Sequence, residues 1–416
     1  MILPSKINDI IYYLTNQFLN LTKFISGNPL ITPPFISGTL EPDDTEIAKK
    51  ILRDSKSWDN TSIIEQYEKN FAYWNGSKYA FSFMGGRVAL SACIYAIGLK
   101  PGDEVILPGY TCVVVPNAFH FAGVKPVYSD IELDTYGLDA SFIENKITSN
   151  TKAILLHHLY GLVCRDYEKI IHIAKKNNLK VIEDCAQSVG AFFKDKKVGN
   201  FGDVAFYSSE QSKGYTTIQG GIAVTNNNSY AERISRFHEK AGYPKNEIIK
   251  KLLYCVILNY NMYKSPQRWW KGDLLRLIHK NKILVSTTEA EINGAKPEYY
   301  GCKMPPPIAM IGLNQLRKID KYNEIRRCMA LKWDSWCEAK GYTKPLIIPE
   351  SIPVYLRYPV LVDPSLKENR KWAYNELSVS LGIWFISNIH PGPYKLKDCK
   401  NAEIAVNQCI NLPTLP

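Results

Sequence analysis

Seven short apolar runs follow one another in the middle of the chain, and several are separated by stretches with helical spacing. The runs are Tyr79–Met84, Glu104–Leu107, Pro126–Ser129, Ala153–His158, Lys180–Asp184, Val204–Ser209 and Gly221–Thr225. Val88–Gly98 and Tyr167–Asn177 are two of the helical stretches. Strands that alternate with helices predict an α/β fold, with a mainly parallel sheet covered by helices on both faces. Because such sheets bind ligands at the carboxyl ends of their strands, we expect the chemistry directly after these runs.

A lysine and a carboxylate follow two of these runs. Lys213 comes shortly after Val204–Ser209 and before the pair Gly220-Gly221, while another run ends in Asp184. A lysine and an acid on neighbouring strand ends can hold pyridoxal phosphate (PLP), the lysine as its Schiff base and the acid on its ring nitrogen. Taken alone, a lysine in such a loop is usually solvated, and Asp184 could instead cap the next helix.

The end of the first run suits a phosphate. Gly85-Gly86 leads into a helical stretch, where a phosphate can approach free amide groups and the helix dipole favours an anion. Arg87 can bind phosphate oxygens with its guanidinium, and Ser208 adds a hydroxyl donor. Gln187, three residues after Asp184, could reach the ring oxygen of the cofactor. A plain turn at the glycine pair is the alternative.

The net charge of +11 is unevenly distributed. Between Lys245 and Lys282, nine Lys or Arg residues and only two acids supply +7 of it. Such a patch suits phosphates, nucleic acid or an anionic membrane surface, but no nucleic-acid-binding motif accompanies it, so we expect no nucleic-acid partner. The ten cysteines are scattered without a CxxC pair, which predicts reduced thiols in a cytosolic protein, and neither a disulfide framework nor a metal site.

Two segments stand outside the alternating pattern. Residues 5–26 predict an amphipathic helix that begins at Ser5 and packs on the body of the protein or on a partner subunit. Residues 244–298 predict a helix at Ile248–Tyr263, followed by a basic stretch around Trp269-Trp270. The second segment is either a helical excursion packed on the protein or an interfacial helix, and both segments are candidates for peripheral membrane contact. No run approaches the ~20 apolar residues of a membrane span.

The remaining patterns complete a division of the chain into five parts. Thr45–Asn75 predicts two helices, Ile308–Tyr322 one long helix and Pro353–Val362 a strand. The expected parts are an N-terminal helix and linker (1–35), a large PLP-binding domain (36–243), a basic aromatic insertion (244–298), a return to the large domain (299–320) and a small C-terminal α+β domain (321–416).

From about Ser37 to the C-terminus, the chain resembles the sugar aminotransferases of the DegT/DnrJ/EryC1/StrS family, which are PLP enzymes of fold type I. The similar motifs are Gly102–Pro108, His158–Gly161, Val181–Gln187, Gly202-Asp203, the spacing of Ser208, Lys213 and Gly220-Gly221, Gln315-Leu316 and Leu412-Pro413. The resemblance implies PLP as the cofactor and the PLP-transferase fold, a mainly parallel seven-stranded sheet flanked by helices with a smaller C-terminal domain.

The resemblance also implies a role for each residue that matches the family pattern. The matching residues are Lys213 as the Schiff-base lysine, Asp184 as the partner of the pyridine nitrogen, Gln187 as a contact of the phenolic oxygen, Gly86 and Ser208 as phosphate ligands, and His390 as a substrate contact near the mouth of the active site.

Several positions depart from the family pattern. Arg87 stands where many members have threonine, and we expect it to bind the cofactor phosphate. Cys112 occupies the place of an aromatic residue that often stacks on the cofactor ring, so that thiol contact or Tyr110 would substitute for stacking. Glu210 puts a charge where an aromatic residue or histidine is usual, and Lys303 replaces an arginine. We expect both to contact the substrate.

The activity that the resemblance implies is transfer of an amino group from an amino acid, by family resemblance glutamate, to a nucleotide-linked keto-deoxysugar. The product would serve surface polysaccharide or glycoconjugate synthesis. A cytoplasmic homodimer with shared active sites is implied, peripheral at the inner membrane face if residues 5–26 or 244–298 contact the membrane. One alternative is a PLP sugar dehydratase, against which Lys213 argues because relatives with that chemistry lack the lysine. The other is a non-catalytic scaffold or membrane-associated subunit of a polysaccharide assembly.

Overall fold

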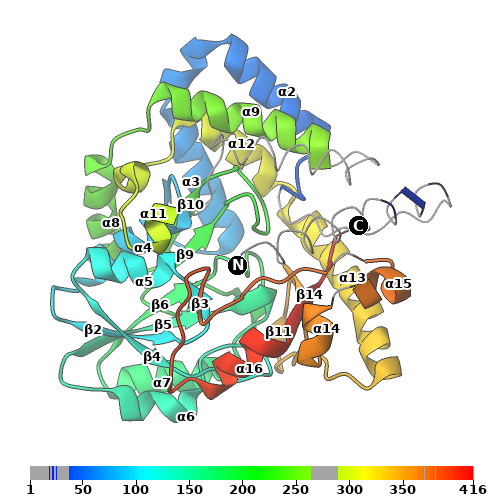
Figure 1. Ribbon diagram of the computed structural model, residues 1–416. Coiled ribbons are helices and arrows are strands. Elements are labelled where there is room, and N and C mark those ends of the chain that lie inside the picture. The colour runs from blue at the N-terminus through cyan, green and yellow to red at the C-terminus, as the bar shows by residue number, and fades with distance from the viewer. Residues whose placement is uncertain are drawn as a thin grey trace, which may run out of the picture.

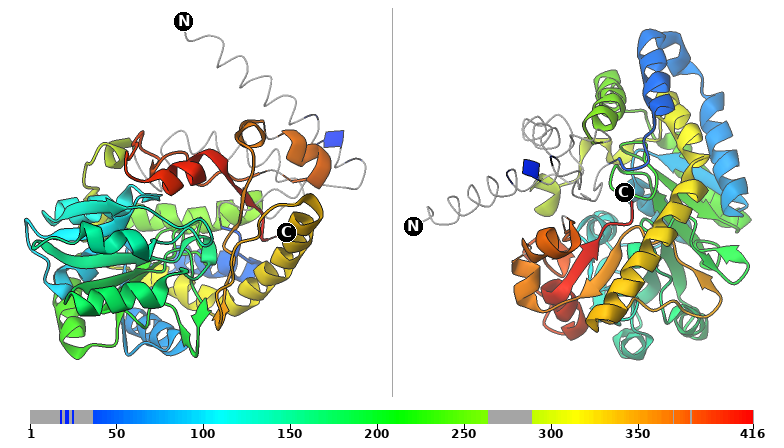
Figure 2. Two further views of the ribbon diagram at one scale, coloured as in Figure 1. Left: turned by 90° about the horizontal axis from the view of Figure 1, so that it is seen from below. Right: turned by 90° about the vertical axis from the view of Figure 1, so that its right-hand side faces the viewer.

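The structure, a computed structural model, describes residues 37–263, 289–369, 371–379 and 381–415, together with Phe18, Leu21, Thr22 and Ile25. The helix predicted at 5–26 lies outside the described residues except for these four, which are helical. The basic stretch around Trp269-Trp270 also lies outside them. The described chain forms a central sheet with helices on both faces, beside a smaller group of C-terminal elements (Figures 1 and 2).

The central sheet has seven strands in the order β1-β10-β9-β6-β5-β2-β4. Their bounds are β1 Tyr79–Phe83, β2 Glu104–Pro108, β4 Lys125–Ser129, β5 Thr151–His157, β6 Lys180–Asp184, β9 Val204–Ser208 and β10 Gly221–Thr225. Strands β9, β6, β5, β2 and β4 run parallel, whereas β10 is antiparallel to both of its neighbours. Each predicted run forms one of these strands, so the mainly parallel seven-stranded sheet is confirmed.

The central strands are buried on both faces. Val105 and Leu107 of β2 belong to one hydrophobic cluster, whereas Ile106 between them belongs to the opposite one. Successive side chains of a strand point to opposite faces, so a doubly covered strand needs apolar residues at every position. The first cluster includes residues of α4 (Gly86–Ile97), α5 (Val114–Phe121) and α8 (Asn228–Lys240), and the second includes residues of α3 (Ser62–Asn75) and α7 (Tyr167–Lys176).

Three helices pack together beyond α3: α2 (Pro42–Arg53), α9 (Asn246–Tyr263) and α12 (Pro306–Leu316). Ile249, Leu253 and Val256 of α9 are buried, so the described start of the 244–298 segment packs on the protein. The single long helix predicted at 308–322 is wrong, because α12 ends at Leu316 and α13 (Ile319–Lys340) follows it. The junction between them places Lys318 against Asp44 of α2, with Nζ 2.7 Å from Oδ2.

The C-terminal elements surround a hydrophobic cluster of their own, which includes Trp333 and Tyr358. They are β12 (Tyr358–Leu361), α14 (Pro364–Glu368), α15 (Lys371–Leu377), β13 (Ile389–His390), α16 (Lys400–Gln408) and β14 (Cys409–Leu412). The strand predicted from 353 to 362 is too long, since only β12 pairs with β14 and Tyr355 takes a φ of 44° that interrupts the extended backbone. The five-part division of the chain stays a prediction. None of the described helices is both long and apolar enough to cross a membrane.

Candidate active site

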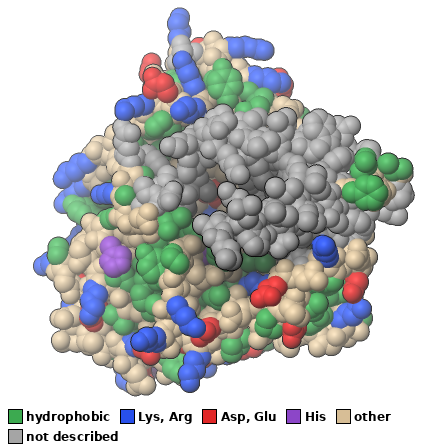
Figure 3. All heavy atoms as spheres, in the orientation of Figure 1, with side chains coloured by type: hydrophobic (Ala, Val, Ile, Leu, Met, Phe, Trp, Pro, Cys, Tyr) green, Lys and Arg blue, Asp and Glu red, His purple; other side chains and the backbone are tan. Residues whose placement is uncertain are grey.

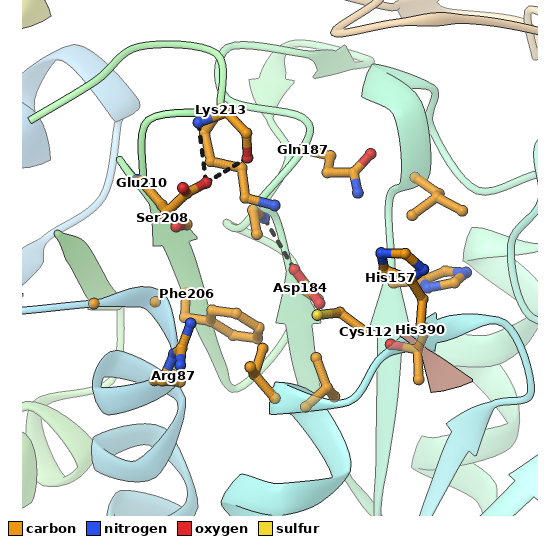
Figure 4. A pocket seen from close by; sticks show the side chains of 18 of the residues that line it. Arg87, Cys112, His157, Asp184, Gln187, Phe206, Ser208, Glu210, Lys213 and His390 are labelled. Atoms are coloured by element: carbon orange, nitrogen blue, oxygen red, sulfur yellow. Dashed lines mark hydrogen bonds between the residues drawn. The ribbon is translucent and has the colours of Figure 1, made fainter. Parts of the chain in front are cut away.

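A cavity of about 390 Å³ lies at the carboxyl ends of the central strands, where the sequence predicts the chemistry. Its wall also takes residues from β3 (Thr111–Cys112) and from β13 of the C-terminal part (Figure 4). The predicted site residues that it brings together are Gly86, Arg87, Cys112, Asp184, Gln187, Ser208, Glu210, Lys213 and His390. Tyr110 and Lys303, although within the described part of the chain, are not among its lining residues.

Lys213 lies on the loop that joins β9 to β10. A backbone hydrogen bond from Ser209 N to Gly220 O (2.9 Å) closes the loop at the strand ends, and Lys213 N–H donates to Glu210 O (2.9 Å). The side chain lines the cavity, with Nζ 5.3 Å from the centroid of the Trp384 ring. The folded loop therefore holds one amine at the end of the sheet.

Asp184 is the last residue of β6, and its carboxylate faces the same cavity. Oδ1 accepts a hydrogen bond from Ala186 N (2.9 Å). Desolvation raises the pKa of this carboxyl above its ordinary value, although the Ala186 amide and the charge of Lys213 oppose the rise. A desolvated carboxylate keeps its charge best beside a cation, and a protonated pyridine nitrogen would be such a cation.

The amino end of α4 and the Ser208 side chain form a cradle. Gly86 lies so close to Ser208 that a Cβ on Gly86 would be 2.9 Å from Ser208 Cβ. Gly85, the N-cap residue of α4, places no side chain over the first turn. The backbone of this turn and the Ser208 hydroxyl can therefore approach a phosphate closely, and the helix dipole favours its charge.

Gln187 contributes a hydrogen-bond donor to the cavity. Its Oε1 accepts a hydrogen bond from Tyr160 N (3.0 Å), so the NH₂ group is the part that can donate to a phenolic oxygen. An amine, an acid, a phosphate cradle and an amide donor thus surround one cavity. This set of groups fits PLP.

Comparisons with known proteins agree with this geometry. The sequence profile of the DegT/DnrJ/EryC1/StrS aminotransferase family matches residues 40–264, more than half of the chain. The chain belongs to this family. The predicted family, the PLP-transferase fold and PLP as the cofactor are thereby confirmed.

Two relatives and one solved structure illustrate the similarity. GDP-perosamine synthase of Escherichia coli O157:H7 is 38% identical over 204 residues, which are 49% of this chain and 56% of that protein. GDP-perosamine synthase of Caulobacter vibrioides is 31% identical over 366 residues, 85% of each chain. The chain thus spans about half the length of the first relative and most of the second. An aminotransferase from Psychrobacter cryohalolentis has the same fold, with a TM-score of 0.69 at 23% identity over 90% of this chain and 93% of that one.

Arg87, a departure from the family pattern, is paired with a carboxylate. Its guanidinium forms an ion pair with Glu291 of α11 (Glu289–Ile292), near the end of the 244–298 segment, and the two side chains are 10% and 3% exposed. The backbone carbonyl of Glu291 accepts a hydrogen bond from Asn117 Nδ2 of α5 (2.7 Å). Arg87 therefore lines the cavity while it is paired with Glu291. Nothing in the sequence indicates this partner.

Tyr110 is not placed to stack on a cofactor, contrary to the prediction. Its ring is fully buried 4.5 Å from that of Phe385, and its hydroxyl shares a hydrogen bond with the hydroxyl of Tyr160 (2.9 Å). The reason is the short parallel ladder in which Cys112 of β3 pairs with His390 of β13. This ladder brings Cys112 to the cavity wall and leaves Tyr110 in the aromatic cluster of the C-terminal part.

Glu210 and Lys303, the two charged departures, differ in placement. Glu210 lines the cavity, and its carboxylate accepts hydrogen bonds from the backbone N–H (3.0 Å) and the hydroxyl of Ser212. Lys303 pairs with Phe83 through the backbone, and its Nζ lies 4.9 Å from the centroid of the Tyr243 ring. Lys303 therefore does not reach the cavity of its own chain, so the predicted substrate contact is not made there.

Three histidines line the cavity, His157, His158 and His390, and only His390 is among the predicted site residues. His157 donates from Nε2 to Tyr136 O (2.7 Å), and burial lowers the pKa of its imidazole to about 4. Burial and the charge of Lys213 lower the pKa of His390 to about 4 as well. The imidazoles of His157 and His390 are therefore neutral near pH 7. The signal for His157 was its place next to the end of the predicted strand Ala153–His158.

Trp384 also lines the cavity and was missed. Its backbone N–H donates to Asn411 Oδ1 (3.0 Å), and the guanidinium carbon of Arg357 lies 4.1 Å from its ring centroid. Trp384 belongs to the C-terminal part and does not follow any predicted strand of the central sheet. The expectation that site residues lie at the carboxyl ends of those strands therefore could not identify it.

Proposed function

We propose that this protein transfers the amino group of an amino acid, by family resemblance glutamate, to the keto group of a nucleotide-linked deoxysugar. One observation carries the proposal: Lys213 and Asp184 face the same cavity, beside the cradle formed by Gly86 and Ser208. The relatives named GDP-perosamine synthase support a nucleotide-linked sugar as the acceptor. The product would serve the synthesis of a surface polysaccharide or glycoconjugate.

The roles of the side chains follow from their positions. When bound, PLP supplies an electron-accepting ring. The Asp184 carboxylate would hold a proton on the ring nitrogen, and the Lys213 amine would move the proton between the donor α-carbon and the cofactor. The Gly86 backbone and the Ser208 hydroxyl would bind the phosphate, and the Gln187 amide would donate to the phenolic oxygen.

The substrate would meet Glu210, Cys112 and His390 on the cavity wall. His390 Nδ1 accepts a weak hydrogen bond from Ile386 N (3.4 Å), which leaves Nε2–H of the neutral ring as the donor. A neutral donor suits a sugar hydroxyl or keto oxygen. The Glu210 carboxylate would accept hydrogen bonds from sugar hydroxyls, which makes it a candidate determinant of sugar specificity.

A homodimer with shared active sites is part of the proposal. Lys303 lies away from the cavity of its own chain, and its position on the way into α12 is consistent with a role in the partner's site. Cytoplasmic location with peripheral contact at the inner membrane face would involve residues 5–26 or 244–298. Within the second segment, Lys250 and Lys251 of α9 are exposed. Basic side chains gather at the top of Figure 3, where α2 and α9 lie in Figure 1.

The test of the function is a panel of nucleotide-linked keto-sugars with glutamate as the donor. We expect one or more members to be aminated by the parent protein and none by Lys213→Ala. A Lys213→Ala protein that still aminated a keto-sugar would overturn the proposal. Release of water from the sugar without consumption of glutamate would point to the dehydratase alternative. Co-sedimentation with anionic liposomes, with and without residues 244–298, tests the membrane contact.

A further inference from the structure

We propose that Glu291 and the cofactor phosphate compete for Arg87, so that the segment 289–301 weakens the binding of PLP. The inference rests on the proposed placement of the phosphate in the cradle of Gly86 and Ser208. It assigns a role to the end of the 244–298 segment, whose contribution to the active site no sequence motif indicates.

Arg87 is positioned to serve either anion. It follows Gly86 directly at the start of α4, and it lines the cavity. Its guanidinium is nevertheless paired with the Glu291 carboxylate, and both side chains are largely enclosed by protein. An arginine offers several N–H donors but only one positive charge. A phosphate in the cradle would therefore share that charge with Glu291, and the two anions would repel each other across a poorly solvated space.

Contacts independent of Arg87 hold the backbone around Glu291 against the protein. The carbonyl of Glu291 accepts a hydrogen bond from Asn117 Nδ2 (2.7 Å), and the carbonyl of Ile292 accepts one from the Tyr394 hydroxyl (3.4 Å). Further along the segment, the ring of Tyr300 packs edge-on against Phe121 of α5 at 5.1 Å. Packing on α5 and the ion pair with Arg87 thus hold the Glu291 carboxylate beside a residue that lines the cavity.

Because both anions compete for Arg87, the ion pair with Glu291 affects PLP binding, and PLP binding affects the ion pair. If Glu291 weakens PLP binding, bound PLP must weaken the hold of Arg87 on Glu291 by the same free energy. Two measurements follow from this reciprocity. Removing the charge of Glu291 should tighten PLP binding, and adding PLP to the unmodified protein should increase amide hydrogen exchange in residues 289–301.

The first experiment compares dissociation constants of PLP and of pyridoxal, which lacks the phosphate. We expect Glu291→Gln to lower the Kd of PLP by roughly tenfold, the effect of one charge-assisted hydrogen bond, and to leave the Kd of pyridoxal unchanged. In an Arg87→Ala background the same substitution should have a smaller effect, because only the direct repulsion between the two anions remains. Glu232→Gln, which removes an exposed glutamate of α8, is the matched control for net charge. An unchanged or raised PLP Kd for Glu291→Gln, or an equal shift for pyridoxal, would overturn the inference.

The hydrogen-exchange experiment needs no variant, so it tests the competition for Arg87 even if Glu291→Gln does not fold. Faster exchange in 289–301 with PLP bound supports competition, whereas unchanged or slower exchange contradicts it. Failure of the proposed function has a different signature. In that case the parent protein would not bind PLP through Lys213, and its visible absorption would not differ from that of Lys213→Ala. Normal PLP binding with no effect at Glu291 would refute the competition alone.

Discussion

His157 and Asp184 are register partners at the carboxyl ends of β5 and β6, and both line the cavity. Because the imidazole of His157 is neutral near pH 7, it brings no compensating charge to the carboxylate beside it. Lys213 and His158 both act to lower the pKa of the Asp184 carboxyl, and in the proposed complex the protonated ring nitrogen of the cofactor would add a positive charge beside it. Asp184 is therefore the residue on which the electronic part of the chemistry should depend.

Replacing Asp184 by Asn should abolish most of the activity without abolishing cofactor binding. The amide cannot hold a proton on the ring nitrogen, and losing one preorganised charge of this kind costs roughly 100-fold or more in rate. We expect the reaction of bound PLP with glutamate, followed by absorbance, to slow by at least this factor. Asp184→Glu is the control that keeps the charge. Normal rates in the Asn variant would show that the ring nitrogen has another partner.

The lowered pKa of His157 should make the folded protein less stable at acid pH. The pKa of His157 is about 4 in the folded protein against an ordinary value of 6.5, so the unfolded chain binds more protons between these values. The stabilising contribution is fully present above pH 6.5 and is lost as the pH falls toward 4, by up to about 3 kcal/mol. The thermal midpoint of His157→Gln should therefore fall less than that of the parent between pH 7 and pH 4. An equal fall in both proteins would place the acid sensitivity elsewhere.

Glu183 should be a structural residue despite its position next to Asp184. Its buried carboxylate accepts hydrogen bonds from the Tyr167 hydroxyl (2.6 Å) and from the backbone of Gly199 (2.8 Å) and Gly202 (2.6 Å). Burial acts to raise the pKa of Glu183, but these donors and the contact with His158 hold it below the ordinary value.

A glutamine at position 183 would place an NH₂ group among donors. We expect Glu183→Gln to lower the free energy of unfolding by about 3 kcal/mol, as judged from denaturant midpoints, while PLP still binds. In the parent, this contribution is present above the ordinary Glu pKa and is lost as the pH falls below it. Retained stability with loss of PLP binding would contradict a structural role.

Tyr110→Phe tests the revised position of that ring. The substitution removes the hydroxyl that shares a hydrogen bond with Tyr160, at a cost of roughly 1 kcal/mol in stability. The PLP dissociation constant should not change, because Tyr110 is not a lining residue of the cavity. Cys112→Ser, which alters a lining residue, is the comparison. A raised PLP Kd in Tyr110→Phe alone would restore the ring to the cofactor site.

The parts of this protein that the sequence predicts well depend on local patterns. Apolar runs such as Val204–Ser209 specify strands, and the carboxyl ends of parallel strands must share an edge, so Asp184 and Lys213 could be brought together without coordinates. Tyr110 was misplaced because a shift of one residue at a strand end decides whether a side chain lines the cavity or packs in the core. Thr111 lines the cavity, whereas Tyr110, directly before it, packs in the core. Glu291 and Trp384 were missed because they come from segments outside the sheet, where no periodic pattern indicates which side chain meets the cavity or its neighbours.

The most direct test of the whole account is the visible absorption of the protein mixed with PLP, measured for the parent and for Lys213→Ala. The parent should show a band distinct from that of free PLP. Sodium borohydride should remove this band and fix the cofactor to Lys213, as peptide mass spectrometry would show. Glutamate should also remove the band, and Lys213→Ala should not form it. A band that persists in Lys213→Ala, or cofactor fixed to another lysine, would contradict the central claim that Lys213 is the catalytic amine of this active site.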